Sequence, residues 1–346
     1  MRREFVFNHP TMKKLLFLLP AAALLLQACS NDFEVTAPWN EIPAVYAILS
    51  PKDTANYIRV EKAFLDPDSS ALKIAQIADS LYFPENAIDV YLERSSTGQR
   101  FQLNRVDGNL EGHVRTGGIF ASQPNWLYKT KQPLAEAETY KLVIIRADGK
   151  PDITAETTIP KEFTFSTPYK GQNNINFERD KSALVKWRSD VNGVYFTINF
   201  RIRYRENALD GLLLGRDTLY WTPVPNIRRT DKLNNNTYEG VAEISTQSFY
   251  SFLVEHIPAA SDRVRHFDGI DITITGGGKE IERYLETAAA NSGITGAEVI
   301  PTYTNLSEGY GIFTAKNYAI LDKVLVKEET INSMNKQSPE KNLNFQ

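Results

Sequence analysis

The chain has 346 residues, of which 42% are hydrophobic and 23% are charged, and its formal net charge is −3. This composition is typical of a globular protein of about two domains and excludes collagen-like, coiled-coil and wholly disordered chains. A weakly acidic chain is a poor candidate for binding nucleic acid, so we expect no nucleic-acid partner. The single cysteine, Cys29, excludes a disulfide framework, a cysteine-ligated zinc site and a thiol enzyme.

Residues 1–28 form a predicted lipoprotein signal peptide. Two lysines at positions 13 and 14 precede a short apolar run over 15–26, which is about half of the ~20 residues that cross a bilayer. The run ends in Leu26, Gln27, Ala28 and Cys29, a sequence that resembles the bacterial lipobox. The resemblance implies that signal peptidase recognises the three residues before the cysteine and that the cysteine becomes the acylated N-terminus. The start of translation stays open between the methionines at positions 1 and 12.

Residues 29–40 form a predicted lipidated tether to the outer membrane. Palmitate or similar chains on Cys29 contribute about 0.8 kcal/mol per buried methylene, so two or three chains hold a domain firmly on lipid. The following residues resemble the acidic signal with which Bacteroidota lipoproteins reach the cell surface: Ser30, Asn31, Asp32, Phe33 and Glu34. An ordinary polar linker is the alternative, and the leaflet that holds the anchor stays open. Because residues 1–28 hold four basic residues and one acidic residue, cleavage changes the net charge from −3 to about −6, which disfavours electrostatic docking onto anionic lipid.

Residues 41–165 are predicted to form a β-sandwich domain. Short apolar runs of strand length are separated by turn residues, at 44–49, 88–93, 100–103, 140–146 and 153–159. Turns at 95–98 and 148–150 predict hairpins between neighbouring runs. Strands of this length and spacing are typical of a sandwich. The insert at 72–83 predicts a short helix or a strand-like loop, and the prolines at 160 and 168 mark the boundary to a second domain.

Residues 166–327 are predicted to form a second β-rich domain with one or two short helices, expected over 248–253 and 279–290. The clearest element is a strand over 194–205, in which six apolar residues alternate with polar ones and therefore share one face. The opposite face carries Arg201, Arg203 and Arg205, which form either a stripe for an anionic ligand or, as we favour, the solvated face of the sheet. Trp187 and Trp221 are predicted core residues. Residues 328–346 are predicted to be a loose polar tail.

The motifs of common enzymes and cofactor sites are missing from the sequence. The glycines at 276–278 precede Lys279 without the spacing of a phosphate-binding loop, and neither GxSxG nor HExxH occurs. Two aspartate pairs have too few neighbouring ligands for an EF-hand but leave calcium binding by a loop open: Asp66 with Asp68, and Asp268 with Asp271. Three histidines lack the spacing of a zinc site: His113, His256 and His266. We therefore expect no enzyme activity, no catalytic residues, no resident metal and no cofactor.

A family resemblance covers roughly residues 38 to 320. It rests on the segments 86–90 and 134–160, which are generic for β-sandwich domains, and on the more distinctive segment 300–313, where Asn305 precedes a glycine-rich turn and a strand. These segments are similar to the Bacteroidota lipoprotein family catalogued as domain of unknown function 4249. The resemblance implies an immunoglobulin-like first domain, a second β-rich domain and genetic pairing with TonB-dependent receptors, and it supplies no catalytic residues. Gly309 and Gly311 are predicted to serve turn geometry or a close approach of two backbones.

The leading functional hypothesis is a non-enzymatic, surface-anchored outer-membrane lipoprotein that acts as a binding or accessory partner of a TonB-dependent transporter. Its contacts are expected in loops at one end of the sandwich, at 66–70, 117–126 and 228–238. Trp126 is either an interface anchor or a core residue. The ligand and the stoichiometry with the partner stay open.

Two other functions remain as alternatives. The first is a structural or assembly subunit of an outer-membrane secretion or insertion complex, whose deletion would remove several outer-membrane proteins rather than one nutrient uptake. The second, less favoured, is a surface glycan hydrolase with a pair of carboxylates, because 42 acidic residues offer too many pairs to name one.

Overall fold

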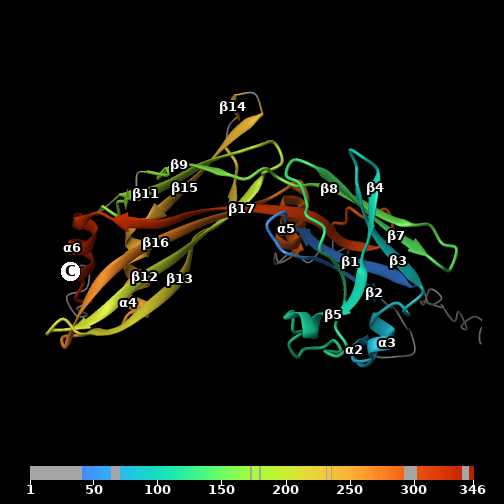
Figure 1. Cartoon of the computed structure of the whole chain (residues 1–346), viewed down its shortest axis with the longest axis horizontal. Helices are drawn as coiled ribbons and strands as arrows, with labels where there is room; N and C mark the ends of the chain where they lie inside the picture. The colour runs from blue at the N-terminus through green and yellow to red at the C-terminus, as the bar shows by residue number, and fades with distance from the viewer. Residues whose placement is uncertain are drawn as a thin grey trace, which may run out of the picture.

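The computed structural model of the whole chain describes residues 41–63, 71–171, 174–178, 181–230, 232–234, 236–291, 302–336 and 343–346 (Figure 1). The predicted signal peptide, the lipobox with Cys29, the tether and the loop at 66–70 with its two aspartates lie outside the described residues. Within these ranges the protein is mostly β, as predicted, and its helices are short.

Among the described residues, the first half of the chain supplies eight strands and three short helical segments. They are β1 (Ile42–Leu49), β2 (Asn56–Ala63), α2 (Ala71–Ala75), α3 (Ala78–Leu81), β3 (Ile88–Arg94), β4 (Gln99–Gln102), β5 (Asn104–Asp107), η1 (Gly108–Glu111), β6 (Trp126–Thr130), β7 (Thr139–Arg146) and β8 (Ile153–Thr158). The insert at 72–83 is therefore helical, which is one of its two predicted forms.

The second half supplies longer strands and three helices among the described residues. They are β9 (Thr164–Thr167), β10 (Asn174–Ile175), β11 (Ser182–Ser189), β12 (Tyr195–Ala208), β13 (Leu213–Arg228), β14 (Lys232–Asn234), β15 (Thr237–Ser245), α4 (Thr246–His256), β16 (Arg263–Gly277), α5 (Lys279–Asn291), β17 (Tyr310–Val326) and α6 (Glu328–Lys336). The predicted helices at 248–253 and 279–290 are confirmed as α4 and α5.

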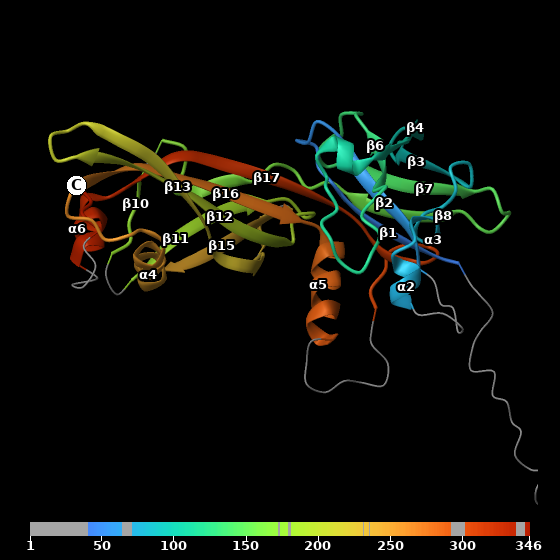
Figure 2. The same ribbon diagram turned by 90° about the horizontal axis from the view of Figure 1, so that it is seen from below.

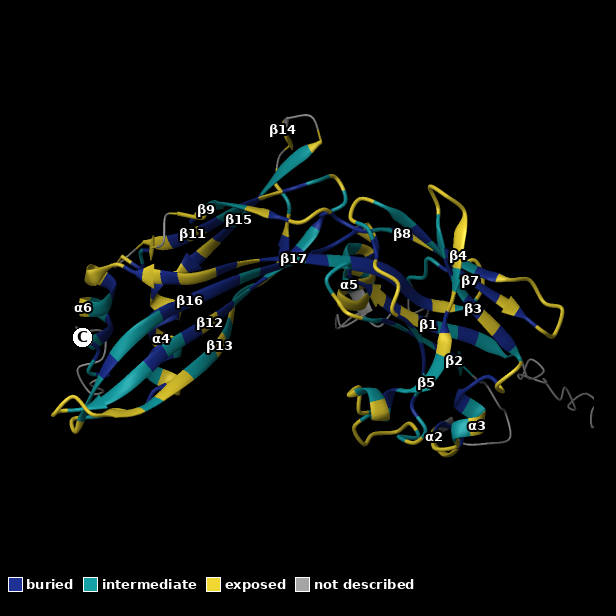
Figure 3. Ribbon diagram, in the orientation of Figure 1, coloured by how far each residue is buried: buried dark blue, intermediate teal, exposed yellow. Residues whose placement is uncertain are grey.

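One nine-stranded sheet runs through the whole length of the molecule. Its order is β13-β12-β16-β17-β1-β2-β6-β5, and β10 adds to β17. The four-stranded sheet β4-β3-β7-β8 packs on one half of it and the sheet β14-β15-β11-β9 on the other half (Figure 1). Each pair of sheets encloses its own hydrophobic core, which is visible as the buried inner faces in Figure 3. The protein is thus built of two sandwich-like halves.

The alternation predicted for 194–205 is confirmed by β12. Its apolar residues from Phe196 to Tyr204 are buried in the second core, while the residues between them are more exposed. Trp187 is fully buried, and Trp221 packs on the same core at its edge, as predicted. A strand with one apolar face forms here because side chains alternate across the sheet and only one face is covered by a second sheet.

The long strand β17 belongs to both halves of the molecule. Its first six residues pair in parallel with β1, and from Lys316 onward it pairs antiparallel with β16. Leu306, Phe313 and Ala315 accordingly complete the core of the first sandwich. That sandwich therefore takes a strand from the far end of the chain to cover the edge of β1.

The predicted close approach of backbones at Gly309 and Gly311 is confirmed. Both residues have positive φ angles, +89° and +122°, and face the β1 backbone. A Cβ at Gly309 would lie 2.2 Å from the carbonyl oxygen of Pro43, and one at Gly311 would lie 1.9 Å from that of Val45. The side chain of Asn305 closes this turn, because its amide donates to the Phe313 carbonyl (2.7 Å) and its oxygen accepts from the Phe313 N–H (3.0 Å).

The prediction of a loose polar tail over 328–346 is wrong for the described residues. Residues 328–336 form α6, and Met334, Leu343 and Phe345 are buried in the second core. The Leu343 carbonyl also accepts a hydrogen bond of 2.7 Å from the buried guanidinium of Arg265. The polar composition misled the prediction because three widely spaced apolar residues are sufficient to attach a short segment to a core.

Candidate functional site

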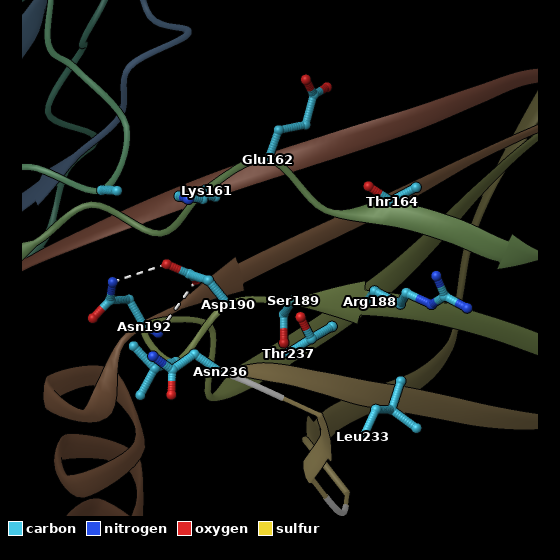
Figure 4. Close-up of a pocket in the computed structure, with 12 residues that line it drawn as sticks. Lys161, Glu162, Thr164, Arg188, Ser189, Asp190, Asn192, Leu233, Asn236 and Thr237 are labelled. Atoms are coloured by element: carbon cyan, nitrogen blue, oxygen red, sulfur yellow. Dashed lines mark hydrogen bonds between the residues drawn. The ribbon is translucent and has the colours of Figure 1, made fainter.

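A cavity with a volume of about 880 Å³ lies where the two sandwiches meet. Its lining comes from the loop before β7, the connection from β8 to β9, the turn from β11 to β12 and the β14–β15 hairpin (Figure 4). The polar side chains on its wall include Lys161, Glu162, Arg188, Asp190, Asn192 and Thr237. A second cavity of about 450 Å³ shares Val191 and Asn192 with it. We take this junction as the candidate site because concave surfaces between domains are common places for ligands.

The turn from β11 to β12 is held by one aspartate. The Asp190 carboxylate accepts hydrogen bonds from the backbone N–H groups of Asn192 and Gly193, at 3.2 Å each, and from the Asn192 side-chain amide at 2.9 Å. These bonds are drawn in part in Figure 4. An aspartate that bonds to the backbone two residues on is a common device for fixing a turn. Asp190 therefore positions the turn and is not a free carboxylate.

The connection between the sandwiches is fixed by the buried side chain of Asn317 in the middle of β17. Its amide donates to the Glu136 carboxylate and to the Pro160 carbonyl, at 2.9 Å each, and its oxygen accepts from the Tyr318 N–H at 2.8 Å. A fully buried amide loses free energy of folding for each donor or acceptor that is left unpaired. The network therefore favours the one arrangement of the connection in which all of these groups are paired. The cavity wall beside residue 160 is therefore built on a fixed frame.

A lysine from the first sandwich crosses to the connection. The ammonium of Lys52 lies 2.5 Å from the Glu162 carboxylate and donates to the Tyr318 carbonyl at 2.6 Å. Glu162 is thus paired at the rim of the cavity, while Lys161 and Arg188 form no ion pair with any described residue. The cavity presents cationic groups, hydroxyls and amides together. This lining fits a polar ligand that accepts hydrogen bonds better than an apolar one.

The second cavity contains a buried carboxylate from the start of α5. Glu280 is 6% exposed, and Thr157 of β8 donates to it at 3.5 Å. The contact fastens α5 to the first sandwich, and Figure 2 shows α5 projecting at the junction of the two halves. No sequence pattern singled out Glu280 or the junction cavity, because the residues that line each cavity come from segments far apart along the chain.

The three predicted outer arginines are paired within the sheet. Arg201 and Arg203 of β12 donate to the buried Asp271 of β16, at 2.8 and 2.7 Å, and Arg205 pairs with Asp268. The two carboxylates that were considered for calcium are therefore committed to arginines. The favoured prediction of a solvated sheet face fits this arrangement, because the arginines of β12 pair with carboxylates of the neighbouring strand β16.

The environment of Asp271 stabilises its ionised form. Burial raises the pKa of the carboxyl, but the hydrogen bond from the Lys323 N–H (2.8 Å) and the charges of Arg201 and Arg203 outweigh burial and hold the pKa below its usual value. The group therefore adds stability that is present above the unfolded pKa of about 3.9 and is lost as the pH falls through the lower folded pKa.

Replacing Asp271 by asparagine should lower the free energy of unfolding by about 2–3 kcal/mol at pH 7. This loss is smaller than the loss from breaking a fully buried ion pair, because both arginines reach solvent. The difference from the wild type should shrink below about pH 4, where the wild-type carboxylate is protonated. Urea unfolding across pH measures both effects. Asp268→Asn is the matched control and should cost less than about 1 kcal/mol, because the Asp268 side chain is 26% exposed whereas that of Asp271 is 3% exposed. Equal costs for the two variants would contradict the assignment.

The predicted histidines and loops do not converge. His113 packs edge-on against Tyr57, His256 packs at a tilt of 30° against Phe252, and His266 lies on β16. Within the described ranges, no group of three or more potential metal ligands occurs. In the same ranges, no helix has the length and apolar character to span a membrane.

The described residues of the candidate contact loops at 117–126 and 228–238 lie on opposite sides of the molecule and not at one end. The first loop lies near β5 and the second around β14 in Figure 1. Trp126 is half-buried at the start of β6, with the guanidinium of Arg105 centred 4.5 Å from its ring. The structure therefore places Trp126 within the sheet and not at a loop tip. The single shared docking end that the sequence suggested does not exist among the described residues.

Comparison with known proteins places most of the chain in one family. No curated protein matches it. The model of the family described as a domain of unknown function (DUF4249) matches residues 41–320. This match includes all strands of the first sandwich, the junction cavity and the glycine turn that joins β17 to β1. The chain therefore belongs to the family of the domain of unknown function DUF4249.

Proposed function

We propose that this protein is a non-enzymatic lipoprotein of the outer membrane, anchored through acylated Cys29 and exposed at the cell surface. In this role it is a binding or accessory partner of a TonB-dependent transporter. The observation that carries the proposal is the sequence itself, in which the only cysteine ends a short apolar run with a lipobox-like motif. A cysteine at this position has a clear chemical use as an acylated N-terminus.

The architecture supports a binding role. Two sandwiches share one sheet, and a network around Asn317 fixes their connection, so the junction cavity has a defined shape. The large cavity is lined by polar groups, and within its described lining no hydroxyl is hydrogen-bonded to a histidine or a carboxylate as an activated nucleophile would be. A preformed polar cavity on an anchored body suits capture of a polar ligand or of a partner's loop.

The test combines Cys29→Ala with a pull-down from native membranes in mild detergent. The tag is inserted in the exposed β7–β8 turn after Gly149, because Phe345 is buried and a C-terminal tag would lie beside the core. The wild-type protein should fractionate with the outer membrane and bring down a TonB-dependent barrel in near-stoichiometric amount. Cys29→Ala should lose both properties, because it removes the thiol that the proposed acyl anchor needs.

The variant Asp32→Asn/Glu34→Gln keeps the cysteine and is the matched control. It should stay in the membrane fraction and lose only protease accessibility from outside the cell, because it removes the acidic residues of the export signal. Recovery of the wild-type protein without a barrel would contradict the transporter partnership. Recovery of a large envelope assembly would instead favour the assembly subunit.

A further inference from the structure

The first sandwich carries a concentration of exposed apolar side chains on two neighbouring segments. We call it the apolar face; its members are 43–87% exposed and are Leu72, Ile77, Leu110, Val114, Ile119 and Phe120. The first two lie on α2 and just before α3, and the other four lie within 108–121. The two segments are joined by a hydrogen bond of 2.8 Å from the Ala121 N–H to the Ala75 carbonyl. Clusters of this kind on a monomer mark sites of contact with a protein or a membrane.

The segment 108–121 has its polar groups inside and its apolar groups outside. Asp107 accepts from the N–H groups of Asn109 and Asn125, and the Asn109 side chain accepts from the Arg115 N–H at 2.9 Å. Asn125 is fully buried and donates to the His113 carbonyl at 2.7 Å. These bonds fix the backbone of the segment. The apolar side chains are therefore held outward by the fold, which is the reverse of the pattern that water selects.

The charged side chains of the segment 108–121 are paired. The Arg115 guanidinium donates to Glu61 at 2.6 Å and to the Tyr82 hydroxyl at 2.9 Å, and it lies over the Phe120 ring. Glu111, the only carboxylate within 108–121, pairs with Lys129. An apolar surface with paired charges behind it suits contact with lipid, because few ionised groups have to be desolvated.

The apolar face lies at the end of the molecule where the chain enters β1. Ile42 is paired with Ala63, the last residue of β2, and α2 begins eight residues later. Figures 1 and 2 show α2 and α3 at this end and the tip of the β12–β13 hairpin at the opposite end. Only 11 residues lie between Cys29 and residue 41, and the 12 steps from one Cα to the next span at most about 43 Å when fully extended. The anchor thus restricts this end of the protein to the vicinity of its bilayer.

We propose that the apolar face inserts into the interface of the bilayer leaflet that holds the acyl chains of Cys29. The inference rests on the proposed function, because the anchor supplies the membrane. Contact through apolar side chains also agrees with the acidic net charge of the chain, which does not favour attraction to anionic lipid. The acyl chains would then hold the protein on the membrane, and the apolar face would set its orientation.

Site-specific labelling tests this orientation on the intact, acylated protein. Acylation blocks Cys29, the only cysteine, so a single new cysteine takes up a thiol-reactive fluorophore selectively. The labelled variants are Leu110→Cys and Phe120→Cys. The matched control is Leu212→Cys at the tip of the β12–β13 hairpin, where Leu209, Leu212, Leu213 and Leu214 are 44–69% exposed. The probe membrane is a vesicle of phosphatidylethanolamine and phosphatidylglycerol containing nitroxide-labelled lipid.

On these vesicles the labels at 110 and 120 should shift their emission to the blue and lose most of their intensity to the nitroxide. The label at 212 should keep its emission wavelength and its intensity. Protein that floats with the vesicles while all three labels stay in water overturns this inference and leaves the anchor intact. Protein that does not float overturns both. Quenching at 212 alone places the opposite end on the bilayer. Labels that are shielded from water before vesicles are added would show that a segment of this chain covers the apolar face. Labels that are shielded only in native membranes would show that a protein partner covers it. Each of these two results overturns the inference.

Discussion

Replacing Gly311 by alanine is expected to lower the free energy of unfolding by at least about 4 kcal/mol, which is exceptional for a single methyl group. The residue has a φ of +122°, and a Cβ there would lie 1.9 Å from the Val45 carbonyl oxygen. Neither atom belongs to a flexible side chain, so the two backbones would have to separate. The parallel pairing of β17 with β1, which joins the two sandwiches, would be lost with them.

Gly149→Ala is the matched control for this prediction. Gly149 also has a positive φ, +75°, but nothing lies within 4 Å of the position of its Cβ. It should therefore incur only the conformational cost of a left-handed residue, about 1–2 kcal/mol. Urea unfolding of both variants separates the clash from the backbone preference. Similar losses for the two variants would contradict the close approach at Gly311.

Replacing Phe345 by alanine is expected to lower the free energy of unfolding by about 3–5 kcal/mol, the usual cost of deleting a buried aromatic ring. The ring is 3% exposed in the second core and lies edge-on to Tyr204, with centroids 5.9 Å apart. Its backbone is held by Asn335, whose side chain accepts from the Phe345 N–H at 2.9 Å and donates to its carbonyl at 2.7 Å.

The neighbouring residue provides the control for Phe345. Gln346 is exposed, so Gln346→Ala should change the free energy of unfolding by less than about 0.5 kcal/mol. Both variants are compared by urea unfolding monitored by the fluorescence of the second-half tryptophans. A loss below about 1 kcal/mol for Phe345→Ala would mean that the last residues do not belong to the core, as the polar composition of the segment first indicated.

The local features of the second half followed from the sequence with little error. The period-2 pattern over 194–205 predicted which face of β12 is buried, and the 3.6-residue pattern over 279–290 predicted α5. These predictions succeed because the spacing of apolar side chains along one element depends only on the geometry of that element. Gly309 and Gly311 were likewise assigned correctly, since few other reasons place two glycines two residues apart before a strand.

The sites of the molecule were harder to predict. The junction cavity gathers side chains from residues 137 to 237, and the network around Asn317 joins β17 to residues 136 and 160. The loops expected at one end lie on opposite sides, because the order of strands in a sheet is not the order in the sequence. The apolar face escaped notice because its six residues are scattered over two segments, with no regular spacing between them.

The amino-acid sequence by itself determined the mostly β character of the protein, the inward face of β12, the helices α4 and α5, and membership of one family. Each of these depends on neighbouring residues or on a linear pattern of residues. Only the tertiary structure decided that β17 closes the edge of β1, that Asp271 pairs with two arginines, that Phe345 is buried and that the segment 108–121 holds its apolar side chains outward. These outcomes depend on which unpaired edges and polar groups meet when distant segments pack, because every buried hydrogen-bonding group needs a partner and no local pattern specifies which one.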